Sequence, residues 1–182
     1  MSLININDSL LLVIDIQTKL LNAAFNNYSI LKKSIIMAKA ASILEIPAIV
    51  TEQYPVGLGS TSNELIEALP KDARYFEKNT FSALDNLEIA ELIRTARKKQ
   101  IILFGIETHI CVSQTAIALT ELGYDVYVIS DACSSRAEVE YIAGIERMKE
   151  HGVHIITTEI ALFEWLRGSK HPKFKEIQSL IK

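Results

Sequence analysis

Two apolar runs, residues 10–14 and residues 101–104, constrain the fold more than any other feature of this 182-residue sequence. Neither run alternates with polar residues, so each is expected to be buried on both faces, as strands are in parallel sheets covered by helices. Apolar residues at helical spacing, as in residues 87–98, lie between such runs. The pattern therefore predicts an α/β protein with three layers and a doubly wound parallel sheet.

The alternation of strand and helix runs along the whole chain without a linker, repeat or low-complexity segment. This length fits one domain, since roughly 100 to 200 residues per domain is usual. We expect a single domain over residues 1–182, with strands near residues 10–15, 47–51, 74–77, 101–104, 124–130 and 153–156. Helices are expected near residues 29–45, 87–98, 110–122, 139–148, 158–166 and 173–181.

Composition and charge exclude several classes of protein. The formal net charge is -3, which offers no basic surface for nucleic acid or an anionic membrane. No apolar stretch approaches the ~20 residues that cross a bilayer, and residues 1–8 lack the pattern of a signal peptide. The two cysteines, Cys111 and Cys133, form neither a zinc pattern nor a disulfide framework. We therefore expect a cytoplasmic protein.

Three reactive side chains follow strands of the predicted sheet. Asp15 ends the first apolar run, Lys78 follows the third strand, and Cys111 opens the helix after residues 101–104. Ligands of parallel sheets bind outside the carboxyl ends of the strands, where these side chains can meet. A carboxylate at a buried strand end needs a partner, and the helix dipole is expected to favour the thiolate of Cys111.

Each of these residues also has a structural interpretation. A cysteine between Ile110 and Val112 can simply fill the core, and a lysine after an edge strand is usually solvated. We interpret Cys133 as structural. An aspartate, a lysine and a cysteine at three strand ends of one sheet are nevertheless more than a packed core requires.

The sequence resembles the isochorismatase-like cysteine hydrolases, and within them the isochorismatase domain-containing proteins. The resemblance rests on Asp15 with Gln17, on Lys78 in residues 78–82, and on Cys111 in residues 105–111, which match the Asp-Lys-Cys signature of that family. Residues 51–59, 131–136 and 171–178 are similar to segments of the same branch. The resemblance implies a six-stranded sheet with the Rossmann-like order 3-2-1-4-5-6.

The resemblance also implies a hydrolase in which Cys111 attacks a carbonyl carbon and forms an acyl-thioenzyme. Asp15 would take the thiol proton and later deliver it to the leaving group, and Lys78 would keep both partners charged. The backbone N–H groups of Glu107 and Cys111 would form the oxyanion hole, with a cis bond between Ile106 and Glu107. A nucleophilic cysteine points to amides or related C–N bonds.

Four further residues are candidates for binding a small-molecule substrate: Gln17, Tyr54, Phe81 and His109. Some relatives hold a metal near the second strand with Asp and His residues, but no histidine precedes His109 here, so we predict no metal site. No glycine follows the first strand, which disfavours a dinucleotide cofactor. We expect no cofactor.

Other functions remain open at this stage. The helix near residues 29–45 is more apolar than packing on one sheet requires, which predicts a homo-oligomer. A non-catalytic oligomeric or partner-binding relative of the family is one alternative, and a vinyl-ether hydrolase of the isochorismate type is another. A phospho-acceptor receiver domain is disfavoured, because no paired acids precede the first helix.

Overall fold

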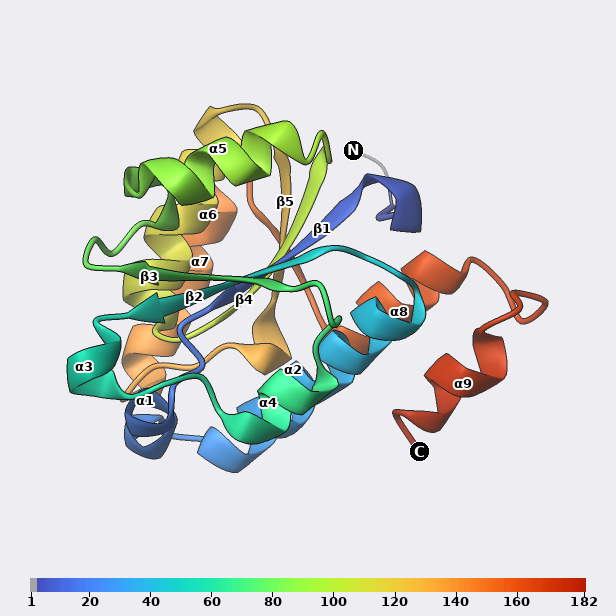
Figure 1. Cartoon of the computed structure of the whole chain (residues 1–182), viewed down its shortest axis with the longest axis horizontal. Coiled ribbons are helices and arrows are strands. Elements are labelled where there is room, and N and C mark those ends of the chain that lie inside the picture. The colour runs from blue at the N-terminus through green and yellow to red at the C-terminus, as the bar shows by residue number, and fades with distance from the viewer. Residues whose placement is uncertain (1–2) are drawn as a thin grey trace.

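The computed structural model describes residues 3–182, and within them six strands form one fully parallel sheet (Figure 1). The strand order β3-β2-β1-β4-β5-β6 confirms the predicted topology. The strands are β1 (Ser9–Ile14), β2 (Ala48–Gln53), β3 (Arg74–Lys78), β4 (Gln100–Gly105), β5 (Asp125–Ile129) and β6 (His154–Ile156).

The two central strands explain the apolar runs of the sequence. Every residue of β1 and of β4 is buried, and the two strands pair in register from Ser9 with Gln100 to Ile14 with Gly105. The edge strand β3 is mostly exposed or half-buried until its last residue, Lys78. Burial on both faces therefore places β1 and β4 at the centre of the sheet, where their carboxyl ends lie side by side.

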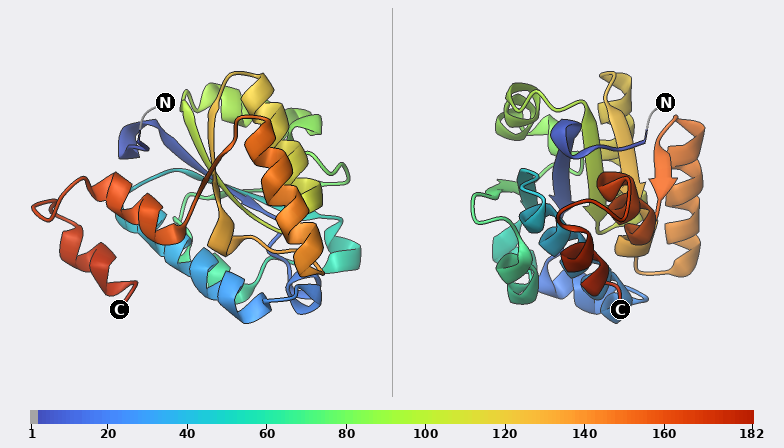
Figure 2. Two further views of the ribbon diagram at one scale, coloured as in Figure 1. Left: turned by 180° about the vertical axis from the view of Figure 1, so that it is seen from behind. Right: turned by 90° about the vertical axis from the view of Figure 1, so that its right-hand side faces the viewer.

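Helices cover both faces of the sheet. On one face α2 packs against α4 and α8, and on the other α6 packs against α7, with α5 alongside (Figures 1 and 2). The helices are α1 (Thr18–Ala23), α2 (Asn27–Ile43), α3 (Pro55–Leu58), α4 (Asn63–Ala68), α5 (Leu87–Thr95), α6 (Ser113–Glu121), α7 (Glu138–Glu150), α8 (Thr158–Leu166) and α9 (Phe174–Ser179). In residues 3–182 no helix is long and apolar enough to span a membrane.

The structure differs from the sequence-based expectation at several boundaries. The short helices α1, α3 and α4 lie where no helix is predicted, and β2 continues to Gln53 because it stays paired with β3 up to Lys78. Part of the apolar surface of α2 is covered within the chain itself by α4 and α9. The apolar composition of α2 is therefore not by itself evidence for a subunit interface.

Gly105 allows the ends of β1 and β4 to approach closely. Its φ is +146°, and a Cβ atom at this position would lie 1.9 Å from the carbonyl oxygen of Ile14. The next residue, Ile106, donates its N–H to that same oxygen at 2.9 Å. Only glycine fits here, because any side chain would collide with the backbone of β1.

Replacing Gly105 with alanine is expected to lower the free energy of unfolding by at least about 2 kcal/mol, because both the φ angle and the contact become unfavourable. Urea denaturation followed by circular dichroism measures the change. Gly168→Ala is the control, since a Cβ there meets no atom within 4 Å. Equal stability of the two variants would contradict this account.

Candidate active site

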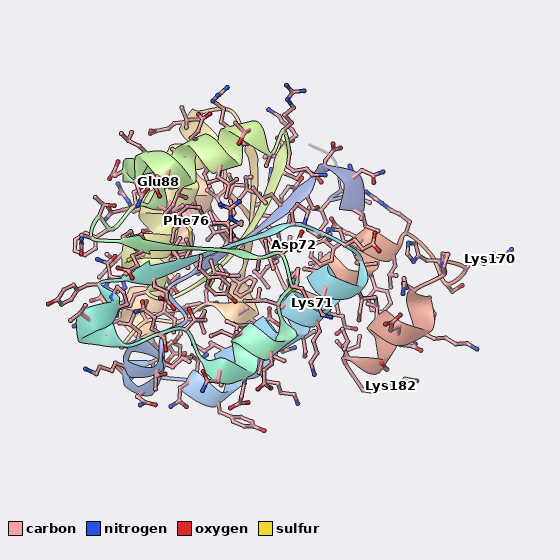
Figure 3. All side chains as sticks on the ribbon, viewed as in Figure 1. Lys71, Asp72, Phe76, Glu88, Lys170 and Lys182 are labelled. Carbon is pink, nitrogen blue, oxygen red and sulfur yellow. The ribbon has the colours of Figure 1, made fainter. Side chains whose placement is uncertain are left out.

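Asp15 and Lys78 form a buried ion pair across the carboxyl ends of β1 and β3. The Lys78 Nζ atom lies 2.7 Å from Asp15 Oδ2, and both side chains are fully buried. In residues 3–182 no other Asp, Glu, Lys or Arg is buried. Lys71 and Glu88 are exposed, and Lys170 lies at the margin of the molecule (Figure 3). A buried pair of charges is stable only with good geometry and additional hydrogen bonds.

The protein supplies those additional hydrogen bonds. Thr51 donates its hydroxyl to Asp15 Oδ1 at 2.6 Å. The three protons of the Lys78 ammonium go to Asp15 Oδ2, to Gln53 Oε1 at 2.6 Å and to the carbonyl oxygen of Thr80 at 3.2 Å. Asp15 itself has a φ of +50°, a left-handed turn that Asp tolerates better than most residues and that ends β1.

Gln17 ties the loop after β2 to the end of that strand. Its side chain is fully buried. Its Nε2 donates to the carbonyl oxygens of Gln53 and Gly59, at 3.0 and 2.5 Å, and its Oε1 accepts the N–H of Gln53 at 2.8 Å. All of its polar atoms are thus bonded to backbone, so Gln17 acts on the site by holding Gln53.

Cys111 lies in a short π-helical turn, Thr108–Val112, that precedes α6. Its side chain is within hydrogen-bonding reach of both Asp15 and Lys78. Burial raises the pKa of the Cys111 thiol to about 12; the Asp15 carboxylate raises it too, while Lys78 acts in the opposite direction. The expectation of a thiolate at Cys111 therefore does not hold, because burial and the Asp15 carboxylate favour the protonated thiol.

The turn before Cys111 is fixed from several sides. The Ile106–Glu107 peptide bond is cis, and Thr108 donates its N–H to the carbonyl oxygen of Ser134 at 2.8 Å. A Cβ at Gly144 would come within 2.9 Å of His109 backbone atoms, so α7 packs directly on this turn. Among the described residues, no acceptor receives the N–H of Glu107. The N–H of Glu107, four residues before Cys111, is thus available as a donor.

The remaining candidate residues lie outside the cluster formed by Asp15, Lys78 and Cys111. The Nδ1 atom of His109 lies 2.9 Å from Ser135 Oγ, and its Nε2 lies 3.8 Å from Glu140. Tyr54 and Phe81 are 55% and 53% exposed, on the loops that follow β2 and β3. Glu107 pairs its side chain with Arg136 at 2.8 Å. Tyr54, Phe81 and His109 are thus not part of the buried cluster.

Two residues that contact the ion pair, Thr51 and Gln53, are not among the site residues predicted from the sequence. Both lie in β2 between the strands that carry Asp15 and Lys78, and Gln53 is paired in register with Lys78. Polar residues at alternate positions near the end of a strand are the signal that could have found them. In residues 3–182 no three His, Cys, Asp or Glu side chains are grouped to hold a metal.

Comparison with solved structures places this arrangement among known proteins. MAR1 ribonuclease from Caenorhabditis elegans superposes with a TM-score of 0.93 at 39% identity, over 99% of this chain and 92% of that one. YcaC from Pseudomonas aeruginosa, solved with hexane-2,5-diol and covalent acrylamide, has a TM-score of 0.91 at 26% identity, over 97% and 90%. The Escherichia coli YcaC gene product, described as an octameric hydrolase of unknown specificity, shares the fold at a TM-score of 0.88 and 24% identity, over 98% and 94%.

Sequence comparison assigns the family. The isochorismatase domain model matches residues 9–160. Isochorismatase domain-containing protein 2 from Xenopus laevis is 39% identical over 173 residues, which make up 95% of this chain and 83% of that protein. The match covers the strands that carry Asp15 and Lys78 and the turn that carries Cys111, and the chain belongs to the isochorismatase family of hydrolases.

Proposed function

We propose that this protein is a cysteine hydrolase that cleaves a small-molecule amide or a related C–N bond with Asp15, Lys78 and Cys111. The main support is the fully buried Asp15–Lys78 ion pair within reach of the Cys111 thiol. A buried ion pair adds little to stability, so its presence beside a thiol favours a catalytic role.

In the proposed reaction, Asp15 takes the proton from the Cys111 sulfur as the sulfur bonds to the substrate carbonyl carbon. The carbonyl oxygen becomes an oxyanion, and the free N–H of Glu107, together with that of Cys111, would stabilise it. Asp15 then protonates the leaving amine as the C–N bond breaks. Water, deprotonated by Asp15, attacks the thioester, and the sulfur leaves and regains its proton.

A thiol that is protonated at rest suits this scheme. Because the Asp15 carboxylate stands beside Cys111, proton transfer can accompany attack, and no resting thiolate is exposed to oxidants. Lys78 would stabilise whichever of the two groups carries the negative charge. Tyr54, Phe81 and His109, which lie around the buried cluster, are the proposed contacts for the substrate.

RNA is the second substrate class to consider, because a structural relative is described as a ribonuclease. The net charge of -3 offers little attraction for a polyanion.

Both cysteines are free, in keeping with the cytoplasmic location proposed from the sequence. A homo-oligomer is the proposed assembly, since the related Escherichia coli protein is described as an octamer.

Substrate screening tests the proposed reaction. Small amides, hydroxamates and cyclic imides are incubated with the wild type and with Cys111→Ala, and mass spectrometry follows both product and any adduct on the protein. We expect the variant to lose turnover by about 1,000-fold or more, since it lacks the nucleophile. Turnover of RNA alone, or equal turnover by both proteins, would refute the proposal. No turnover and no adduct would favour a non-catalytic relative.

The pH dependence of alkylation tests the protonation state of Cys111. Its raised pKa means that the reactive thiolate forms only at high pH, so the rate with iodoacetamide should climb about tenfold per pH unit without a plateau below pH ~9.5. Near neutral pH, Cys111 should react more slowly than a free thiol. The measurement uses Cys133→Ala, which removes the second cysteine, and a plateau below pH ~8 would contradict it.

Removing the charge of Asp15 and removing that of Lys78 should change the alkylation rate of Cys111 in opposite directions. Asp15→Asn removes a negative neighbour, so it should lower the pKa of Cys111 and speed alkylation at pH ~8 while turnover falls about 100-fold or more. Lys78→Met removes the positive neighbour and should slow alkylation. Mass spectrometry of the Cys111 peptide gives the alkylation rate constant of each variant. Changes in the same direction would contradict the opposite effects of Asp15 and Lys78 on the Cys111 thiol.

A further inference from the structure

Gln53 is a half-buried residue that contacts the buried ion pair, and the mechanism above assigns it no role. Its Oε1 atom lies 2.6 Å from the Lys78 Nζ atom, a shorter contact than the 2.7 Å of the Asp15–Lys78 pair. An ammonium group has three protons to donate, and Asp15, Gln53 and the Thr80 carbonyl oxygen accept one each. Gln53 thus provides the only neutral side-chain acceptor in this set.

The carboxamide of Gln53 is held in one orientation. Its Nε2 donates to the carbonyl oxygen of Asn79 at 3.1 Å, and its backbone is bonded on both sides by the buried amide of Gln17. A flipped carboxamide would lose the Asn79 bond and turn its NH₂ toward the ammonium, which has no lone pair to accept it. The oxygen of Gln53 therefore faces Lys78.

We propose that Gln53 is a positioning residue that holds the Lys78 ammonium in place while Asp15 is protonated, without adding a second negative charge to the site. The inference rests on the proposed function, in which the proton of the Cys111 thiol passes to Asp15. At that moment Asp15 is neutral and holds Lys78 less strongly. Gln53 and the Thr80 carbonyl oxygen keep the ammonium beside the Cys111 sulfur while the sulfur loses its proton and attacks.

Neutrality of the side chain is central to this role. At rest the cluster contains one carboxylate, one ammonium and one thiol, so its net charge is zero. A carboxylate in place of the Gln53 amide would compete with Asp15 for Lys78 and would disfavour a thiolate nearby. The neighbouring carboxylates do not compete for Lys78. Glu52 accepts hydrogen bonds from Thr61, and Glu77 is exposed.

Two variants separate this role from a purely structural one. Gln53→Glu keeps the size of the side chain and adds one charge, while Asn79→Asp adds the same charge at an exposed neighbouring position. In a Cys133→Ala background, the rate of Cys111 alkylation by iodoacetamide is measured against pH. We expect Gln53→Glu to slow alkylation about tenfold at pH ~9, and Asn79→Asp to stay within about twofold of the parent, because solvent screens an exposed charge.

A charge exchange provides the second measurement. Asp15→Asn leaves Lys78 buried without a carboxylate, so its thermal unfolding temperature should fall. Adding Gln53→Glu should restore much of the loss, because it returns a carboxylate to within hydrogen-bonding distance of the ammonium, whereas adding Asn79→Asp should not. Recovery in the first double variant alone supports the proposal, even if Gln53→Glu by itself fails to fold.

The outcomes distinguish this inference from the proposed function. Equal alkylation profiles for Gln53→Glu and Asn79→Asp, or equal unfolding temperatures for the two double variants, would overturn the role of Gln53 whatever the substrate is. A wild type that hydrolyses no amide, together with the expected alkylation shift and recovery, would overturn the proposed function and leave Gln53 as the residue that sets the position of Lys78.

Discussion

The fully buried ion pair of Asp15 and Lys78 is the interaction on which the rest of the site depends. Removing two charges from water costs several kcal/mol per ion even after relaxation, and their attraction offsets this only when further hydrogen bonds complete the geometry. Thr51 and Gln53 complete it, and both come from β2, the strand that separates the two partners. Strand order therefore determines the site, since β2 must lie between β1 and β3.

The Cys111 thiol reaches this pair because β4 lies against β1 on the other side. The approach depends on Gly105, which lets the chain pass the Ile14 carbonyl oxygen one residue before Asp15. The tight turn that follows delivers Cys111 to a buried place, where burial raises the pKa of its thiol. A protonated thiol, an adjacent carboxylate and an ammonium then form a neutral cluster, in which a proton can move without changing the net charge.

Periodicity predicts the layers, the sheet and the three strand ends, because burial of β1 and β4 leaves a direct mark on the sequence. It does not predict where β2 ends, since a strand continued by polar residues looks like a loop when its partner is unknown. Gln53 was missed for that reason: its role follows from its register with Lys78, which lies 25 positions away in the sequence. The protonation state of Cys111 depends likewise on burial, which arises only after folding.

The buried ion pair and the exposed loops around it belong to different parts of this fold. The strands fix the ion pair and the thiol through pairing and burial, whereas exposed residues such as Tyr54 and Phe81 lie on the loops that the same strands lead into. Gln17 joins the two parts, because its buried amide bonds to Gln53 and to Gly59 at the end of the Tyr54 loop. That loop therefore starts and ends at fixed points while its exposed side chains can change without disturbing the ion pair. Changes in this loop would therefore alter the surface around the cluster and leave the buried ion pair in place.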